Sequence, residues 1–92
     1  MSVRWTRQAR AELRELVAWL SGRNRAAAQR ARAEFVAAAE LIGSHPGVSR
    51  PGRSPETREL SLPRWSKVII YEETDSVSVI ILTIRDTRRA DS

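Results

Sequence analysis

The spacing of apolar residues changes once along this 92-residue chain, and that change limits the possible folds more than any other feature. As far as Gly43, apolar residues recur every three or four positions, which is typical of one face of a helix. From Arg58 onward they alternate or form short β-branched runs, which is typical of strands. Residues 45–57, with three Pro and two Gly, are expected to form a loop between the two halves. This order predicts a single α+β domain over residues 1–92, with helices packed on one face of a sheet.

The helical half divides into two helices that form a hairpin over about residues 6–43. Thr6 and Asn24 have side chains that suit the N-cap positions of the first and the second helix. Gly22 suits the end of the first helix, and Pro46 prevents the second from continuing. The apolar faces are Ala9, Leu13, Leu16, Val17 and Leu20 in the first helix and Ala31, Phe35, Ala38 and Ile42 in the second.

The remaining half predicts a small antiparallel sheet of three or four strands over residues 58–85, followed by a charged tail at residues 86–92. Pro63 and a turn at residues 74–76 separate its runs, and a short edge strand at residues 2–5 would be the fourth strand. The three runs are residues 58–62, 67–72 and 77–84.

Two helices can cover only one face of this sheet, so the other face is open. In the last strand, Val79 and Ile81 share a face with Thr83 and Arg85, which makes that face polar toward the end of the strand. We therefore assign Val79 and Ile81 to the open face. An open apolar face in a small protein indicates a partner that covers it, and the alternative cover is the loop 45–57 with the Trp side chains.

Composition excludes several classes of protein. The chain has no Cys and one His, His45, which leaves no disulfide scaffold, no thiolate zinc site and no multi-histidine metal site. No apolar run is long enough for a membrane span or a signal peptide, so we expect a cytoplasmic protein without membrane contact, metal or cofactor. The net charge is +5, and 15 of the 16 basic residues are Arg. This charge fits either a solvated surface or an acidic partner, such as a nucleic acid or an acidic protein segment.

Few side chains could carry catalysis, because the sequence has no phosphate-binding loop, no nucleophile motif and no metal-ligand spacing. Metal-free cleavage of RNA needs cations at the phosphate and a general acid and base. The candidates are the cations Arg58, Lys67 and Arg85 and the acid Tyr71. His45, beside Pro46, fits a cap or surface role better. Trp19 and Trp65 fit either core filling or a binding hot spot.

The segment between the two halves carries a motif. Residues 46–60 read P-G-V-S-R-P-G-R-S-P-E-T-R-E-L and follow the pattern P-x-x-G-R-P-G-R-x-x-x-T-R-E-L, with Ser49 in place of Gly. The run Val68-Ile69-Ile70-Tyr71 matches a hydrophobic strand that ends in Tyr, and residues 85–89 are similar to a terminal H-x-x-R segment without its His. Over almost its whole length the chain resembles the ParE branch of the RelE/ParE toxin superfamily.

The resemblance implies a RelE/ParE-like fold and the toxin of a type II toxin–antitoxin system, neutralised by a ParD-like antitoxin in a hetero-oligomer. Toxins of the ParE branch inhibit DNA gyrase by protein binding, so no direct DNA binding is expected of the toxin alone. We expect the target to contact Arg85, Arg88 and Arg89. We expect the antitoxin to contact Trp19, Arg58, Trp65, Val79 and Ile81.

Two alternatives stay open. The RelE branch cuts mRNA on the ribosome with several basic residues and a Tyr or His near the C-terminus. In that case Arg58, Tyr71 and Arg85 would be catalytic, although no aromatic residue or His follows Tyr71. The other alternative is a remnant that binds the antitoxin but has lost its target activity.

Overall fold

The computed structural model describes residues 2–52, 54–74 and 78–89. The elements are β1 (Ser2–Trp5), α1 (Arg7–Ser21), α2 (Arg25–Ser44), η1 (Pro46–Val48), β2 (Arg50–Pro51), β3 (Thr57–Leu62), η2 (Pro63–Trp65), β4 (Lys67–Glu73), β5 (Ser78–Asp86) and η3 (Thr87–Arg89), where η marks a short 3-10 helix. The centre of the expected turn at residues 75–76, the expected strand start at Val77 and residues 90–92 of the expected tail lie outside the described residues.

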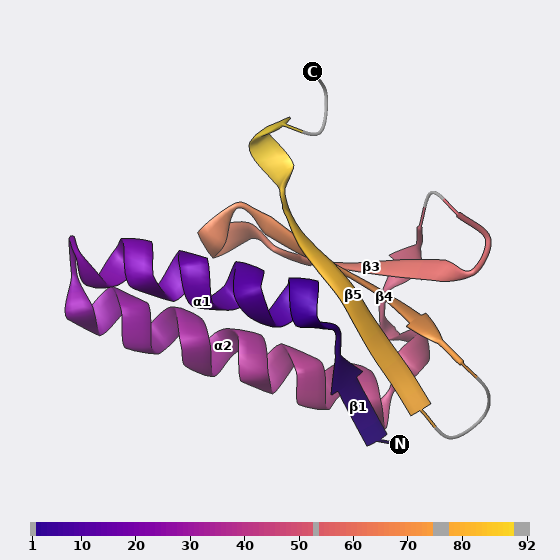
Figure 1. Ribbon diagram of the computed structural model, residues 1–92. Coiled ribbons are helices and arrows are strands. Elements are labelled where there is room, and N and C mark those ends of the chain that lie inside the picture. Colours follow the sequence, from indigo (N-terminus) through magenta and orange to yellow (C-terminus); the bar gives the residue numbers. More distant parts are fainter. Residues whose placement is uncertain (1, 53, 75–77, 90–92) are drawn as a thin grey trace.

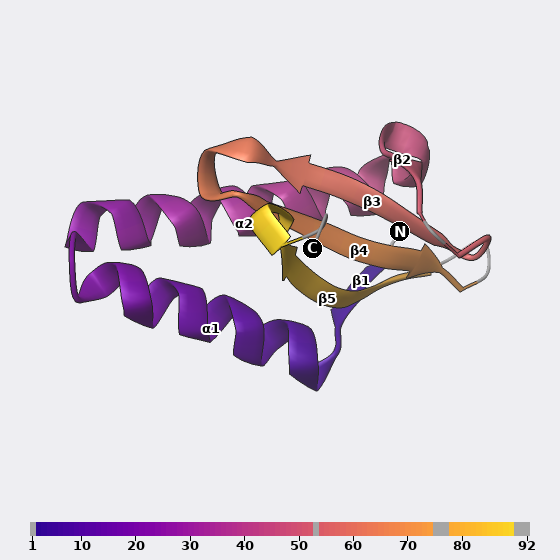
Figure 2. The ribbon, with the colours of Figure 1, turned by 90° about the horizontal axis from the view of Figure 1, so that it is seen from above.

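The two helices run side by side and pack on one face of a five-stranded sheet with the order β1-β5-β4-β3-β2 (Figures 1 and 2). The predicted α+β class and the helical hairpin on a sheet are therefore confirmed. The sheet is mixed, because β1 runs parallel to β5 while the other neighbours are antiparallel. The fifth strand, β2, arises inside the segment expected as a loop, since it pairs with the start of β3. None of the described helices is long and apolar enough to cross a membrane.

Both helices begin at the residues that the capping signals predict. Thr6 Oγ1 and Asn24 Oδ1 each accept a hydrogen bond at 3.0 Å from the backbone N–H three residues further on. α2 continues one residue beyond the expected Gly43 and ends at Ser44. The local sequence is therefore sufficient to define the hairpin.

The hydrophobic core lies between α2, the first turns of α1 and the central strands β4 and β5. Phe35 and Ile42 of α2 are completely buried and belong to one cluster with Ile69 and Tyr71 of β4. Ala9 lies in the same cluster, where its small side chain lets α1 approach the sheet closely.

Because of a β-bulge in β5, the side chains of the last strand face other sides of the sheet than the sequence predicts. The pairing with β4 passes from Ile81 to Thr83 and leaves Leu82 as an extra residue. One extra residue reverses the alternation of side chains beyond it, so Val79, Ile81 and Ile84 all belong to the core. The expectation that Val79 and Ile81 lie on an open face is wrong, because both are completely buried. The polar residues at the end of β5 therefore do not indicate which face the side chains before the bulge occupy.

The side chains of Thr6, the N-cap of α1, and of Glu12 in α1 close the edge of β5 next to this bulge, beyond the part that β1 covers. Thr6 Oγ1 donates to the Leu82 carbonyl at 2.8 Å, and Glu12 Oε1 accepts from the Ile84 N–H at 2.8 Å. Glu12 also accepts a hydrogen bond from the Thr83 hydroxyl at 2.7 Å. Because these backbone groups are already bonded, a further strand cannot pair with them.

Candidate functional site

The motif at residues 46–60 is held against β4 by the side chains of Tyr71 and Arg58. Tyr71 is completely buried, and its hydroxyl donates to the Pro46 carbonyl at 2.6 Å and hydrogen-bonds to Ser49 Oγ. Arg58 Nη1 donates to the Ser49 carbonyl at 3.1 Å, and Arg58 Nε lies 3.7 Å from Glu73 Oε1. Ser49, the departure from the family pattern, thus contributes its own hydroxyl to the contact. This part of the motif fixes the path of the chain from α2 to β3.

Glycine at position 52 is required by the turn that leads from β2 into β3. The Gly52 N–H donates to the Thr57 carbonyl at 2.8 Å, and a Cβ atom on Gly52 would overlap the Thr57 side chain. The G-R-x-x-x-T spacing of the motif therefore has a steric explanation.

The three residues proposed for a ribonuclease mechanism do not come together. Tyr71 faces the core, and Arg58 lies opposite it on the paired strand β3. Arg85 follows the core residue Ile84 on β5, so its side chain lies on the other face of the sheet. A completely buried hydroxyl cannot protonate a substrate at the surface.

Replacing Tyr71 by Phe is expected to lower the free energy of unfolding by about 1–3 kcal/mol, because the part-buried Pro46 carbonyl loses its donor. Urea denaturation followed by circular dichroism measures this change. Ser61→Ala, at an exposed position of β3, is the control and should stay within about 0.5 kcal/mol. An unfolding midpoint equal to that of the wild type would show that the hydroxyl does not hold the motif.

In the last turn, η3, the side chain of Arg88 is held in place by Asp86. Asp86 Oδ1 accepts hydrogen bonds from the Arg88 N–H at 2.9 Å and from Arg88 Nε at 3.2 Å. Asp86 Oδ2 lies 2.9 Å from Arg88 Nη2 and 3.5 Å from Lys67 Nζ. These hydrogen bonds from Arg88 hold the pKa of the Asp86 carboxyl well below its ordinary value and raise the pKa of Arg88. The pairing therefore favours the charged forms of both groups.

Two of the three expected target-binding residues can be placed. Arg85 and Arg88 are exposed near the end of β5, and Arg88 is paired with Asp86. Arg89 ends η3, but its side chain lies outside the described part of the structure. Arg85 and Arg88 remain available to an acidic partner surface.

The two Trp residues expected to contact the antitoxin line one hollow of about 860 Å³ between α1 and the β3–β4 connection. Trp19 is 56% exposed, and the Arg23 guanidinium lies 4.0 Å from the centre of its ring. Trp65 is half-buried, and its indole N–H donates to Glu34 at 2.9 Å. Asp86 and Arg88 line the same hollow, so the Trp residues lie next to η3, and Arg58 is not among the lining residues. The residues expected to bind the antitoxin therefore do not form one surface.

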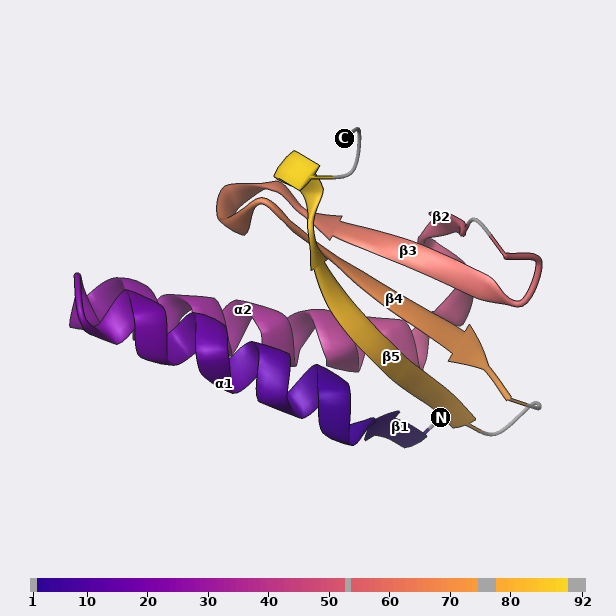
Figure 3. The ribbon, with the colours of Figure 1, turned by 45° about the horizontal axis from the view of Figure 1, so that its top comes forward.

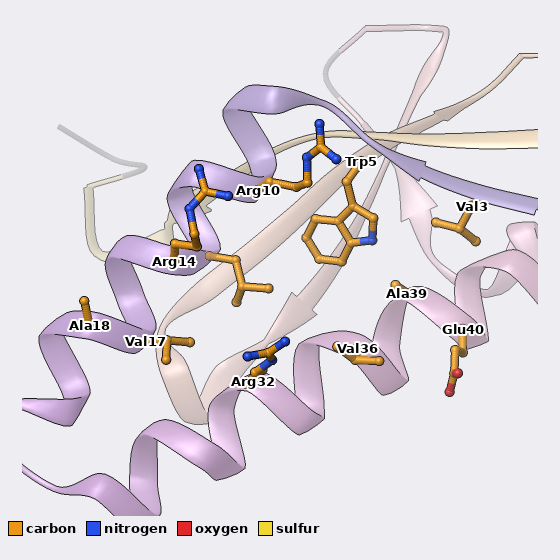
Figure 4. Close-up of a pocket in the computed structure, with 11 residues that line it drawn as sticks. Val3, Trp5, Arg10, Arg14, Val17, Ala18, Arg32, Val36, Ala39 and Glu40 are labelled. Atoms are coloured by element: carbon orange, nitrogen blue, oxygen red, sulfur yellow. The ribbon is translucent and has the colours of Figure 1, made fainter.

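A second hollow, which the sequence did not predict, lies between α1, α2 and β1 (Figure 4). We call this surface the hairpin groove; its volume is about 750 Å³. Its residues are the apolar Val3, Trp5, Leu13, Val17, Ala18, Val36 and Ala39 and the charged Arg10, Arg14, Arg32 and Glu40. The sequence feature that could have indicated this hollow is Val36, an apolar residue outside the buried stripe of α2. In the structure, Val36 is 45% exposed.

Within residues 2–52, 54–74 and 78–89, no group of three or more His, Cys, Asp or Glu side chains is placed to hold a metal ion.

Comparison with known proteins identifies related chains. The model of a family described as the ParE toxin of the type II toxin–antitoxin system, parDE, matches residues 3–91. A curated relative, the putative toxin Y4kP of Sinorhizobium fredii, is 32% identical over 78 residues, which cover 85% of this chain and 81% of that protein. A solved structure, the chromosomal ParDE toxin–antitoxin system from P. aeruginosa, superposes with a TM-score of 0.80 at 26% identity. The superposition covers 94% of this chain and 95% of that chain.

Proposed function

Since this chain belongs to the ParE toxin family of type II toxin–antitoxin systems, we propose that it inhibits DNA gyrase by binding and is neutralised by a ParD-like antitoxin in the cytoplasm. The toxin would act through surface contacts alone, without metal, cofactor or covalent chemistry.

The position of Tyr71 is the observation that favours inhibition by binding over cleavage of mRNA. The only aromatic hydroxyl of the chain is completely buried and bonded to the Pro46 carbonyl, so it is engaged in holding the motif. Cleavage without a metal would need an accessible acid close to the cations. Here Arg58 and Arg85 lie on opposite faces of the sheet, which supports a toxin that acts by binding.

The cationic end of β5 supports a protein target. Asp86 fixes the backbone and the guanidinium of Arg88 through charge-assisted hydrogen bonds, so little side-chain entropy is lost when a partner binds. The Trp-lined hollow beside η3 offers apolar area next to these charges. Arginine and tryptophan together are the residue types that most often dominate protein interfaces.

Induction of the chain in growing cells, with and without its cognate antitoxin, tests the proposal. We expect growth arrest with the toxin alone and normal growth when the antitoxin is also produced. Purified ribosomes programmed with mRNA should retain an intact message when the toxin is added. Cleavage at the ribosomal A site would favour a RelE-type ribonuclease, and growth without arrest would favour an inactive remnant.

A further inference from the structure

Trp19 and Trp65 line the hollow between α1 and the β3–β4 connection, which we call the Trp hollow. Its volume of about 860 Å³ lies within the range of about 300–1,000 Å³ that is typical of binding pockets. Trp19 is 56% exposed and Trp65 is half-buried, and Leu16 and Leu20 of α1 add further apolar surface. The fold therefore leaves large aromatic side chains exposed to water, and covering them favours binding of a partner.

Contacts within the protein hold the walls of the Trp hollow in place. Glu34 of α2 accepts a hydrogen bond from the Trp65 indole N–H at 2.9 Å and another from Arg64 Nη1 at 3.1 Å. On the opposite wall, the Arg23 guanidinium lies 4.0 Å from the centre of the Trp19 ring, as in a cation–π contact. Side chains that are already held in place lose little conformational entropy when a partner binds, so these walls are suited to tight binding.

Backbone groups beside the Trp hollow are already bonded within the protein. The Ile84 N–H donates to Glu12 at 2.8 Å. The Thr87 N–H donates to the Ser66 carbonyl at 2.9 Å, and the Ser66 N–H donates to the Pro63 carbonyl at 3.1 Å. Because these groups have partners, an occupant cannot add a strand to them. We therefore expect recognition through an apolar side chain that inserts into the hollow.

The charges of the Trp hollow indicate which residues flank that side chain. Arg64 and Arg88 line it from the connection and from η3, and both stay exposed although they pair with Glu34 and Asp86. A guanidinium has five N–H donors, so each arginine keeps donors for a further carboxylate. Glu15, also a lining residue, belongs to the α1 wall. An acidic residue beside the inserted side chain would therefore meet the arginines and avoid the α1 wall.

The Trp hollow is continuous with the cationic end of β5. Asp86 and Arg88 line it, and the β3–β4 connection lies at the same end of the sheet as η3 (Figure 3). The hairpin groove shares none of its described lining residues with the Trp hollow. A partner bound at the Trp hollow and η3 therefore covers a different set of residues from a partner bound in the hairpin groove.

We propose that the Trp hollow receives an apolar side chain from an acidic segment of the target, and that Glu34 positions Trp65 and Arg64 for this contact. Under the proposed function, on which this inference rests, the target is gyrase. The inference assigns both Trp residues to the target and not to the antitoxin, for which the hairpin groove stays free.

The test measures the affinity of purified toxin variants for purified gyrase and, separately, for the purified cognate antitoxin by surface plasmon resonance. Trp19→Ala removes one aromatic wall and is expected to weaken gyrase binding about thirtyfold or more. Leu41→Ala is the matched control, because Leu41 is 43% exposed on the neighbouring helix and does not line the Trp hollow. The control should bind gyrase within about twofold of the wild type. Affinity for the antitoxin should stay within about threefold in both variants, which also shows that they are folded.

A second pair of variants tests the cationic side of the Trp hollow. Arg64→Ala removes a charged donor and is expected to weaken gyrase binding about tenfold or more. Arg30→Ala is the control, since Arg30 is exposed on α2 and does not line the Trp hollow. It removes the same charge and should bind gyrase within about threefold of the wild type. Because Arg64 is exposed, this pair keeps the test valid even if Trp19→Ala fails to fold.

Two variants of Glu34 test its positioning role. Glu34→Ala takes the acceptor away from the Trp65 indole N–H and is expected to weaken gyrase binding about fivefold, because the side chains then have to be ordered by the partner. Glu34→Gln keeps an oxygen that can accept from the indole N–H and should bind gyrase within about twofold of the wild type. Equal losses in the two variants would contradict the positioning of Trp65 by Glu34.

The outcomes separate this inference from the proposed function. Wild-type affinity for gyrase in both Trp19→Ala and Arg64→Ala would overturn the Trp hollow as the target site, while gyrase binding itself would stand. Weakened antitoxin binding with unchanged gyrase binding would also overturn it, because the hollow would then belong to the antitoxin. Equal losses in the variants and in their controls would overturn it as well, because the effect would be general. Failure of the wild-type toxin to bind gyrase would instead overturn the proposed function.

Discussion

The triple replacement of Arg85, Arg88 and Arg89 by Ala is expected to raise the toxin concentration needed to inhibit gyrase by at least about a hundredfold. A hydrogen bond to a charged group contributes about 1.5–3 kcal/mol, and two such contacts correspond to about a hundredfold in affinity. Supercoiling assays over a range of toxin concentrations measure the change. Affinity for the antitoxin should stay within about threefold, because η3 lies far from β1 in the ribbon (Figures 1 and 3) and neither Arg85 nor Arg88 lines the hairpin groove.

The control for this triple variant replaces three exposed arginines of the helices, Arg7, Arg25 and Arg30, by Ala. It removes the same net charge and should inhibit gyrase within about threefold of the wild type. Equal loss of inhibition in both triple variants would indicate a general effect of positive charge on encounter with gyrase. If the variant with Arg85, Arg88 and Arg89 replaced by Ala still inhibits gyrase like the wild type, the end of β5 and η3 are excluded as the target-binding surface.

Replacing Phe35 by Ala is expected to have the largest effect on stability. Its side chain is completely buried at the centre of the core, and the loss of a buried Phe costs about 3–5 kcal/mol. A chain of this length has a total stability of only about 5–10 kcal/mol, so the variant should be close to unfolding at 37 °C. Thermal denaturation and urea titration followed by circular dichroism measure the loss.

Leu41→Ala is the control for this prediction, because Leu41 lies on the same helix and is 43% exposed. The control should change the free energy of unfolding by less than about 1 kcal/mol. A cost below about 1 kcal/mol for Phe35→Ala would mean that α2 does not depend on this core contact.

The parts of the fold that depend on local signals could be predicted from the sequence. Thr6 and Asn24 mark both helix starts, since an N-cap needs only a side-chain oxygen and a free N–H three residues away. The change of apolar period correctly separates the helices from the sheet. Strand β2 was missed, because a strand of two residues has no period of its own and depends on its pairing with β3.

The parts that depend on register could not be predicted. The bulge at Leu82 has no Gly or other local signal. Its backbone is held by the hydrogen bond that Thr6 donates to Leu82 and by the one that Glu12 of α1 accepts from Ile84, and both partners lie some 70 residues or more away in sequence. Because one extra residue reverses the alternation, the whole first half of β5 was assigned to the wrong face. Val79 and Ile81 were therefore placed in the antitoxin site although they are core residues.

The sequence predicts which types of residue form the candidate site, but it does not predict which of these residues lie together in the structure. Arg85 and Arg88 are exposed as expected, whereas the ion pair between Asp86 and Arg88 depends on the geometry of η3. Trp19 and Trp65 share one hollow, but that hollow adjoins η3. The hairpin groove brings together residues from three elements, and no single segment of the sequence shows it.

The most direct measurement is the supercoiling activity of purified DNA gyrase with the toxin alone and then with the toxin and its cognate antitoxin. We expect inhibition by the toxin alone and recovery of supercoiling when the antitoxin is added in equal amount. Full gyrase activity in the presence of a folded toxin that binds its antitoxin tightly would contradict gyrase as the target.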